Sequence, residues 1–510
     1  MFFGTWMALL PPLVAIVLAL LTKEVYSSLF IGIIVGGALF AGGNFIGTLN
    51  HVFFGEGAGL VPQLSDSYNV GILIFLVFLG IIVALMNKAG GSAAFGRWVG
   101  AHVKSRIGVQ LMTVLLGCLI FIDDYFNCLT VGSVMRPVTD QKKVSRAKLA
   151  YLIDATAAPI CIIAPISSWA AAVASYAPDG TNGIVLFIQS IPFNYYAILT
   201  IVMMIVITLL KFDFGPMKKH EENAAKGDLF TVGGTEQKND AILGKGKVID
   251  LILPIVILIV GCVFGMLYSG SFFDGESFID AFANSDASVG LVLGSFGGVV
   301  VTLLFYIIRG VLKFRECMDC IVEGFKAMVP AITILALAWT LKGMTGSLGA
   351  TEFVQALLSG DTAKGFSIFL PMIIFLVAVG MSFATGTSWG TFGILIPITL
   401  GVFPLTSGNP LGIVCVSACM AGAVCGDHCS PISDTTIMSS AGAQCNHMAN
   451  VSTQLPYALL VAGVSTVAYF ISALLQQVIP GAVLPLLIAI ALMVAVLLLI
   501  YVFVGKKKKA

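Results

Sequence analysis

Long apolar runs, separated by short polar segments, fill almost the whole chain. A run of about 17–25 apolar residues is long enough to cross a bilayer as a helix. The pattern predicts about eleven such helices, at residues 6–22, 25–43, 69–88, 149–177, 186–210, 249–269, 288–308, 323–345, 411–440, 455–477 and 482–504. We therefore expect an all-α polytopic membrane protein.

Two further apolar stretches, 107–138 and 366–400, do not fit a simple spanning helix. Each is too long for one crossing and too short for two crossings with a turn, and each has polar residues at its centre. Non-helical backbone at membrane depth survives only where it is buried in protein or faces water. We predict a re-entrant helical hairpin in each stretch; the alternative is one long, kinked and tilted helix.

The two halves of the chain repeat the same order of elements: three helices, a hairpin, a helix broken by polar residues, and another helix. The broken helices, 149–177 and 411–440, share a short motif, which reads Ala164-Pro165-Ile166-Ser167-Ser168 in the first and Ser430-Pro431-Ile432-Ser433-Asp434 in the second. An odd number of crossings precedes the polar segment between the halves, so the repeats are predicted to be inverted. Inverted repeats with broken helices near the midplane are typical of secondary transporters.

This pattern gives a domain organisation in four parts. Residues 1–211 form the first repeat and residues 248–480 the second. Residues 212–247 are mixed in charge and contain few large apolar side chains, so we expect a flexible cytoplasmic linker. Residues 481–510 add one helix and a basic tail.

Composition and charge agree with a membrane protein. Hydrophobic residues make up 58% of the 510 residues and charged residues 10%, whereas a soluble domain carries about 25% charge. The net charge of +1 gives no reason to expect a nucleic-acid partner. Lys and Arg gather in the loops predicted on one side, with Lys342 and Lys364 as the exceptions, so we place the N-terminus outside and the C-terminus in the cytoplasm. The expected location is the cytoplasmic membrane.

Carboxylates inside apolar segments are the first candidates for chemistry. A charged Asp at the centre of a membrane helix costs about 2.5–3.5 kcal/mol and usually marks an ion or proton path. The neighbours Asp123 and Asp124 can both face a cavity only at a hairpin tip, and Asp154 either lines a cytoplasmic funnel or lies near the headgroups. The candidates for ion or proton binding are Asp123, Asp124, Asn127, Asp154, Asp427 and Asp434.

Oxygen-bearing side chains near the hairpin tips and helix breaks supply further candidates. Proline in each break frees backbone carbonyls, and hard cations such as Na⁺ prefer carbonyl, carboxylate and hydroxyl oxygens. Candidates for ion or substrate binding are Ser167, Ser168, Thr385, Thr387, Ser388, His428, Ser430, Ser433 and Thr435. The Na⁺ ligands are predicted among Asp123, Asn127, Thr387, Ser388, Asp427 and Asp434.

Each of these assignments has a structural alternative. The serines could bond back to a proline-kinked helix, and His428 is either a proton relay, a substrate ligand or a buried structural residue. A zinc site at Cys425, Asp427, His428 and Cys429 is disfavoured, because one short helical run does not supply tetrahedral geometry.

Four motifs resemble the NhaC family of Na⁺/H⁺ antiporters, within the ion transporter superfamily. They are FIDDYFNCLTVGS (121–133), DATAAPICIIAPISSWAA (154–171), GTSWGTFGILIPI (386–398) and CGDHCSPISDTT (425–436). The resemblance implies inverted repeats with re-entrant hairpins facing broken helices, a homodimer, and an elevator-like movement. Similarity to sodium-dicarboxylate carriers of that superfamily implies Na⁺ between each tip and its broken helix, with substrate between the tips.

The hypothesis that follows is secondary active exchange of Na⁺ for H⁺ through an Asp-rich site at the midplane. The alternative is Na⁺- or H⁺-coupled transport of a small organic solute, either an amino acid or an organic acid. The expected partners are Na⁺, H⁺, the lipid bilayer and a second copy of the chain. We expect no enzyme activity and no cofactor other than Na⁺ as the coupling or transported ion.

Overall fold

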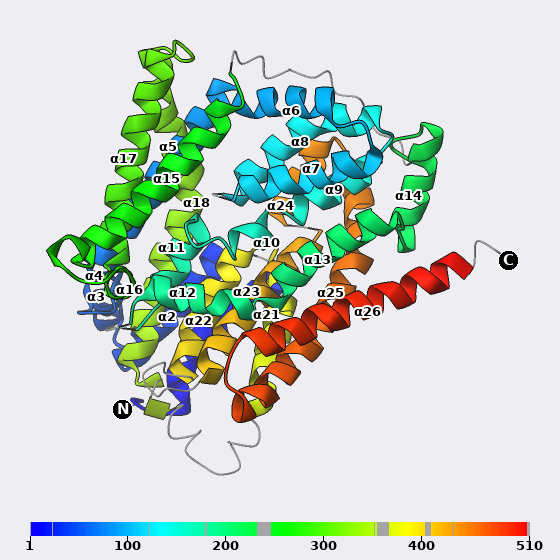
Figure 1. Ribbon diagram of the computed structural model, residues 1–510. Coiled ribbons are helices and arrows are strands. Elements are labelled where there is room, and N and C mark those ends of the chain that lie inside the picture. The colour runs from blue at the N-terminus through cyan, green and yellow to red at the C-terminus, as the bar shows by residue number, and fades with distance from the viewer. Residues whose placement is uncertain are drawn as a thin grey trace.

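Helices form every regular element in the part of the chain that the structure describes (Figure 1). The computed structural model describes residues 2–22, 24–121, 123–178, 181–231, 246–350, 352–353, 367–402, 410–431 and 433–506. Lys364, residues 232–245 of the expected linker and the last four residues of the basic tail lie outside these ranges. The prediction of an all-α fold is confirmed.

Seven helices among the described residues are long and apolar enough to cross a membrane. They are α5 (Ser67–Ala89), α15 (Ile249–Ser269), α17 (Ala287–Ile308), α18 (Phe314–Ser347), α23 (Pro410–Cys429), α25 (His447–Val478) and α26 (Val483–Lys506). An eighth span results if α12 (Gly183–Ser190) and α13 (Tyr195–Leu210), joined by η2 (Ile191–Phe193) and bent by 47°, count as one. The expected count of about eleven is not confirmed, because α1 (Leu10–Thr22) and α2 (Val25–Phe40) are short and the 149–177 segment is broken.

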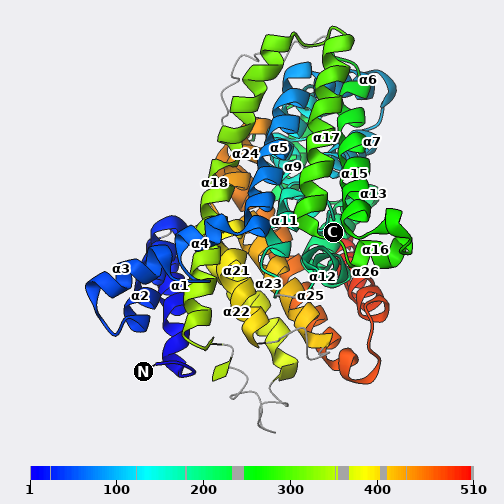
Figure 2. The same cartoon turned by 90° about the vertical axis from the view of Figure 1, so that its left-hand side faces the viewer.

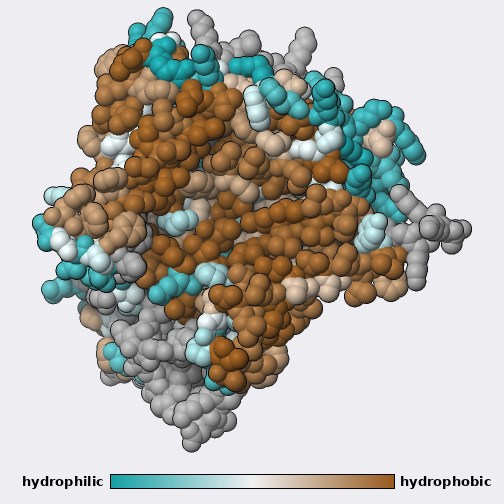
Figure 3. All heavy atoms as spheres, viewed as in Figure 1, coloured by the Kyte–Doolittle hydropathy of each residue, from teal (hydrophilic) through white to brown (hydrophobic). Residues whose placement is uncertain are grey.

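A broad apolar surface covers the outside of these helices. Figure 3 shows hydrophobic residues over α15, α17 and α26, with hydrophilic residues gathered at the upper and outer edges. Exposed side chains on this surface include Phe264, Leu304 and Leu499. Such side chains fit lipid, and the molecule is a multi-pass membrane protein.

The two awkward apolar stretches each form a helical hairpin. The first consists of α7 (Arg106–Leu119) and α8 (Asp124–Gln141), and the second of α21 (Leu370–Thr385) and α22 (Ser388–Val402). The second tip turns through Gly386, whose φ of 69° lies in the left-handed region that glycine adopts without strain. Entry and exit of each hairpin on the same side of a bilayer stays a prediction.

The two polar-interrupted helices are divided into short pieces. The first comprises α9 (Arg146–Asp154), α10 (Ala158–Cys161) and α11 (Ser168–Ala174), and the second comprises α23 and α24 (Asp434–Ala443). Pro165 and Pro431 lie in the non-helical connections. Proline lacks the amide donor that would continue a helix, so the breaks follow from the sequence.

Hairpins and broken helices contact each other reciprocally. The α7–α8 hairpin packs on α9 of its own half and on α24 of the other half. The α21–α22 hairpin packs on α23, while Trp389 and Phe392 of α22 contact Trp169 of α11. In both views the first hairpin lies in the upper part of the molecule and the second in the lower part (Figures 1 and 2). The two tips therefore approach each other from opposite ends.

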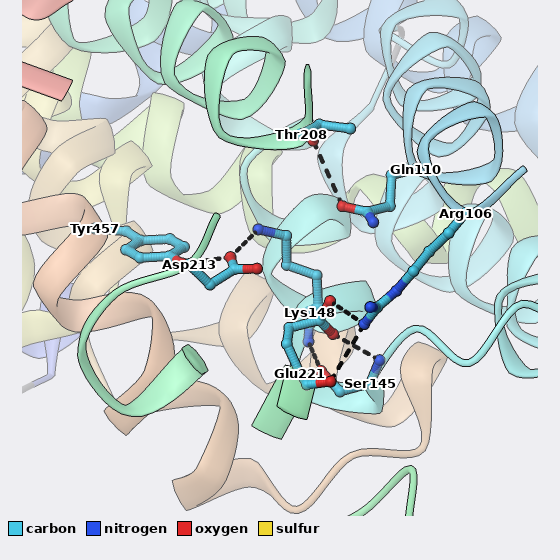
Figure 4. Close-up of polar contacts among 8 residues, drawn as sticks. All are labelled: Arg106, Gln110, Ser145, Lys148, Thr208, Asp213, Glu221 and Tyr457. Atoms are coloured by element: carbon cyan, nitrogen blue, oxygen red, sulfur yellow. Dashed lines mark hydrogen bonds and ion pairs between the residues drawn. The ribbon is translucent and has the colours of Figure 1, made fainter. Parts of the chain in front are cut away.

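The segment expected to be a flexible linker begins with an ordered helix, α14 (Gly215–Lys226), which packs on α9 and α25. Glu221 of α14 and Asp213, two residues before the helix, attach this segment to α7, α9 and α25 (Figure 4). Glu221 accepts hydrogen bonds from Arg106 Nη2 at 2.6 Å and Ser145 N at 2.8 Å. Asp213 accepts from Lys148 Nζ at 2.6 Å and Tyr457 Oη at 2.6 Å. Ion pairs thus hold residues 213–226 against neighbouring helices, and a linker role for residues 212–247 stays a prediction.

Glycines bring α15 and α17 into close contact. A Cβ atom on Gly265 would lie 2.2 Å from the Gly290 carbonyl oxygen, and one on Gly261 would lie 2.7 Å from that of Gly294. Small residues at such spacing let membrane helices approach closely. These helices pack with α5, and α5 packs with α18, to form one group.

Short helices complete the fold. They are η1 (Trp6–Leu9), α3 (Phe45–Phe54), α4 (Leu60–Ser65), α6 (Gly91–His102), η3 (Phe272–Asp274), α16 (Phe278–Ala283) and η4 (Ser367–Phe369). Polar caps start several helices: Asn44 accepts from Gly47 N, and Ser145 accepts from Lys148 N.

Candidate ion and substrate site

A cavity of about 440 Å³ lies where the two hairpin tips meet α18 and the start of α2. Three carboxylates, three aromatic rings and the second tip form much of its wall: Glu24, Asp123, Asp434, Tyr26, Tyr125, Trp389, Thr385, Gly386 and Thr387. The described lining residues include no Lys or Arg. The cavity is therefore strongly acidic, which favours cations.

Direct contacts join the first hairpin to the second broken helix beside this cavity. Tyr125 Oη donates to Asp434 Oδ2 at 3.4 Å, and Cys128 Sγ donates to the Thr435 carbonyl at 3.6 Å. Segments 121–130 and 425–434, which are about 300 residues apart in the sequence, thus lie together.

Asp427 binds the second hairpin tip. Its Oδ2 accepts from Ser388 Oγ at 2.7 Å and from Ser388 N at 3.3 Å, and only 4% of the residue is exposed. Its other oxygen, Oδ1, is buried and has no hydrogen-bond partner at normal geometry, although the Ser433 hydroxyl interacts with the same carboxyl group. A buried carboxylate oxygen in this state is costly unless a proton or a cation satisfies it.

Asp124 lies behind the cavity wall, close to Asp427. It is in the first turn of α8 and 1% exposed. Its Oδ1 has no hydrogen-bond partner at normal geometry, although the Trp169 side chain interacts with the carboxyl group. Asp123 and Asp427 both interact with it electrostatically. The adjacent Asp123 instead lines the cavity, so the two neighbours point to different places. Several carboxylates concentrated at this point repel one another unless positive charge is bound.

Asp154 is buried in the protein rather than near an outer edge. It ends α9, is 1% exposed, and accepts from Gln454 Nε2 of α25 at 3.0 Å. The cavity lining does not include it. Its expected position, in a cytoplasmic funnel or near the headgroups, stays a prediction.

Several predicted ligands bond to nearby backbone. Ser167 caps α11 and donates to Cys161 O at 2.9 Å, and Asn127 Nδ2 donates to Gly117 O, Ile120 O and Thr156 O. Ser433 caps α24, Ser430 donates to Phe383 O at 2.7 Å, and Thr385 donates to Met381 O at 3.0 Å. Ser168 and Thr435 are buried beside the breaks. The bonds of the Ser167 hydroxyl and of Asn127 Nδ2 therefore fit the alternative in which these groups bond to the backbone rather than to an ion.

The six predicted Na⁺ ligands are divided between two places. Asp123, Thr387 and Asp434 line the cavity, whereas Ser388 and Asp427 form a buried pair behind it. Asn127 is buried at the base of the first tip, with Oδ1 unpartnered. Within the described ranges, no three His, Cys, Asp or Glu side chains gather as a metal site would need.

His428 is enclosed by two tyrosines. Its Nδ1 lies 2.8 Å from Tyr196 Oη, and its ring stacks on Tyr151 with centroids 6.1 Å apart. It is 1% exposed and is not among the cavity residues. Contact with a solute in the cavity would need a rearrangement. His428 Nε2 is buried without a hydrogen-bond partner, so the choice between a proton relay and a structural role stays open.

With this geometry, similarity to known proteins becomes informative. The model of the Na⁺/H⁺ antiporter family matches residues 176–474. The chain belongs to the Na⁺/H⁺ antiporter family. It is therefore a sodium-coupled transporter. An uncharacterized protein of Haemophilus influenzae is 38% identical over 91% of this chain and 90% of its own length.

Other similarities cover less or show only the fold. The malate-2H⁺/Na⁺-lactate antiporter of Bacillus subtilis is 31% identical over 178 residues, which are 33% of each chain. The YdaH transporter of Alcanivorax borkumensis aligns with a TM-score of 0.52 at 12% identity, covering 81% of this chain and 87% of that one. This structural likeness supports a transporter fold.

The family match includes Asp427 and Asp434 but begins after the first hairpin. Asp123, Asp124 and Asp154 lie outside the matched residues. The spatial contacts between α8 and α24, rather than the match, connect these carboxylates with the antiporter-family segment.

Sequence reasoning missed four residues that the structure places at these sites: Glu24, Tyr26, Tyr125 and Gln454. Glu24 caps α2, accepting from Tyr26 N at 3.1 Å. As a lone acid between two apolar runs it could have been noticed, but it looks like an ordinary loop residue. Gln454 is one of several amides in α25, so it does not stand out, and its partner is 300 residues away.

The tip sequence Gly386-Thr387-Ser388-Trp389-Gly390 matches the G-x-S-x-G pattern of hydrolase nucleophiles. That pattern requires a strand before the serine and a histidine as its base. Here α21 precedes the tip, and Ser388 Oγ donates to a carboxylate and to Ala423 O at 3.2 Å. This geometry fits ion coordination better than acyl transfer.

Proposed function

We propose that this protein exchanges Na⁺ for H⁺ across the cytoplasmic membrane through the site around Asp427. The observation that carries the proposal is the unpartnered, buried Asp427 Oδ1 beside Asp124, whose Oδ1 is also unpartnered. Two such carboxylates at one place need bound positive charge. Binding of Na⁺ there, in alternation with the binding of a proton by the protein, constitutes exchange.

The residues present suit Na⁺ better than a softer metal. Carboxylate oxygens of Asp427 and Asp124 would be joined by hydroxyl or carbonyl oxygens at the second tip, such as those of Ser388 and Thr387. Oxygen ligands of this kind favour hard cations. Asp123 and Asp434 at the cavity wall would attract the ion electrostatically as it enters.

The proposal includes an outside N-terminus, a cytoplasmic C-terminus, a homodimer and an elevator-like movement. The reciprocal packing of hairpins on broken helices supports a unit that moves as one body. The group formed by α5, α15, α17 and α18 would then remain fixed, and the cavity lies against α18 of that group.

A second candidate is coupled transport of a small organic solute. The cavity volume of about 440 Å³ favours it, since pockets of about 300–1,000 Å³ hold small molecules. The acidic and aromatic wall suits the ammonium group of an amino acid. An organic acid, such as those in the name of the Bacillus relative, would need bound Na⁺ or protons to neutralise its charge.

Purified protein in proteoliposomes tests both candidates. An imposed Na⁺ gradient should drive proton movement, read by an enclosed pH dye, with no organic solute present. Asp427→Asn should abolish the proton movement. Asp274→Asn, which changes an exposed carboxylate in η3 outside the site, should leave it unchanged. Saturable Na⁺-dependent uptake of a labelled amino acid, without proton flux, would favour the second candidate instead.

A further inference from the structure

Asp154 and Gln454 form a buried acid–amide pair at the junction of α9, α24 and α25. Gln454 is 0% exposed, and its Nε2 donates to Asp154 Oδ2 at 3.0 Å and to the His428 carbonyl at 2.7 Å. Both amide hydrogens of Gln454 are therefore used.

Two oxygens of this pair have no hydrogen-bond partner. Asp154 Oδ1 and Gln454 Oε1 are both buried and both act only as acceptors in their present form. Among the described side chains, Asp154 forms no ion pair with Lys or Arg. The nearest basic residue along α9, Lys148, pairs with Asp213 instead. No cation therefore neutralises a charged carboxylate in this position, although the hydroxyl groups of Thr435 and Thr436 on α24 interact with it.

We propose that Asp154 Oδ1 binds the proton that is exchanged for Na⁺, and that it donates this proton to Gln454 Oε1. One proton then satisfies both unpartnered oxygens, and the pair closes into two antiparallel hydrogen bonds. This inference rests on the proposed function. It separates the two ions: Na⁺ binds around Asp427, and the proton binds at Asp154.

The surroundings of Asp154 explain how the two sites are coupled. The titratable groups that interact with it are Asp427 on α23 and Cys128 on α8, while α24 presents the hydroxyl groups of Thr435 and Thr436. When Na⁺ neutralises Asp427, repulsion that favours the protonated form of Asp154 falls, and the proton leaves. By linkage, protonation of Asp154 weakens Na⁺ binding equally.

Gln454 also supplies a mechanical connection. Its amide holds the carbonyl of His428, the residue after Asp427, so the pair contacts the same turn of α23 that presents the Na⁺ site. A change of hydrogen bonding at Asp154 reaches that turn through one side chain.

Asp154→Asn is the informative variant, because asparagine can form the same two hydrogen bonds with Gln454. We expect the purified variant to fold and to bind Na⁺ in isothermal titration. Addition of Na⁺ should no longer release protons into a weakly buffered solution, and Na⁺-driven proton flux in proteoliposomes should be lost. The infrared carbonyl band of a protonated carboxyl group should be present in the Na⁺-free wild type and missing in the variant.

Asp286→Asn, at an exposed helix cap, is the matched control and should keep proton release, flux and the infrared band. Undiminished proton release in folded Asp154→Asn would overturn the inference, and so would loss of its Na⁺ binding, which would make Asp154 a Na⁺ ligand. A wild type without Na⁺-driven proton flux would instead overturn the proposed function, and with it the exchange role of Asp154.

Discussion

A single hydroxyl group at the second tip, that of Ser388, helps to hold the central carboxylate. Its Oγ donates to Asp427 at 2.7 Å. Ser388→Ala should weaken apparent Na⁺ affinity roughly tenfold to 100-fold, since a hydrogen bond to a charged group contributes about 1.5–3 kcal/mol. The measurement is the Na⁺ concentration for half-maximal proton flux.

Thr391→Val provides the comparison for Ser388→Ala. Thr391 lies one turn along the same helix, and its hydroxyl donates to the Thr387 carbonyl rather than to a carboxylate. Equal loss of Na⁺ affinity in both variants would contradict a specific role for Ser388.

At the level of residues, the sequence identifies charges that are out of place but not their partners. Asp124 and Asp427 are conspicuous because charge in an apolar run is costly. That Asp123 faces the cavity while Asp124 does not depends on how the first tip turns. Gln454 and Glu24 reach their sites only through packing of α25 on α9 and of α2 on α18.

Among the elements, α14 and the residues just before it are attached by charges that a membrane protein seldom buries. Lys148 is 1% exposed at its side chain, pairs with Asp213, and lies over the rings of Tyr151 and Tyr457. Lys148→Met should destabilise the protein by about 3–5 kcal/mol, because it leaves Asp213 largely buried without its cation.

A double-mutant cycle on thermal unfolding measures this pair. Lys148→Met combined with Asp213→Leu should cost clearly less than the sum of the single changes, because no buried charge remains. Additive losses would show that the two side chains act independently.

The same helix should give a pH-dependent stability through Glu221. Burial raises the pKa of Glu221, Asp213 raises it further, and Arg106 and Lys148 lower it. Since the pKa in the folded protein lies above that of the unfolded chain, the contribution is fully present at low pH and is lost as pH rises through the folded value.

We therefore expect the wild type to lose Tm relative to Glu221→Gln as pH increases from acid to neutral. Glu222→Gln, which alters the exposed neighbour, should run parallel to the wild type. A constant difference between wild type and Glu221→Gln across this range would refute the assignment.

At this scale, hairpins and broken helices were predictable because length, polar centres and prolines mark them. The ordered helix α14 was not, since its composition resembles a linker. Arg106 pairs with Glu221 in the helix and Lys148 with Asp213 just before it, and both cations are distant in the sequence. Lys342 shows the same limit. It violates the charge rule for loops, but its Nζ donates to the Tyr176 carbonyl at 3.2 Å, near the end of α11, where a cation is favourable.

For the molecule as a whole, Na⁺ should stabilise the folded state because it binds that state alone. At about 100 times the dissociation constant the gain is about 2.7 kcal/mol. Tm should rise with NaCl over KCl of equal ionic strength, and the rise should vanish in Asp427→Asn. An equal rise with both salts would point to ionic strength rather than binding.

The glycine contacts between α15 and α17 have a consequence for measuring motion. Two helices whose backbones touch cannot slide or separate without breaking that contact, so they behave as one rigid unit. The distance between a spin label on α15 and one on α17 should therefore stay constant. A change in the distance from either label to a third label on α22 then reports displacement of the second hairpin.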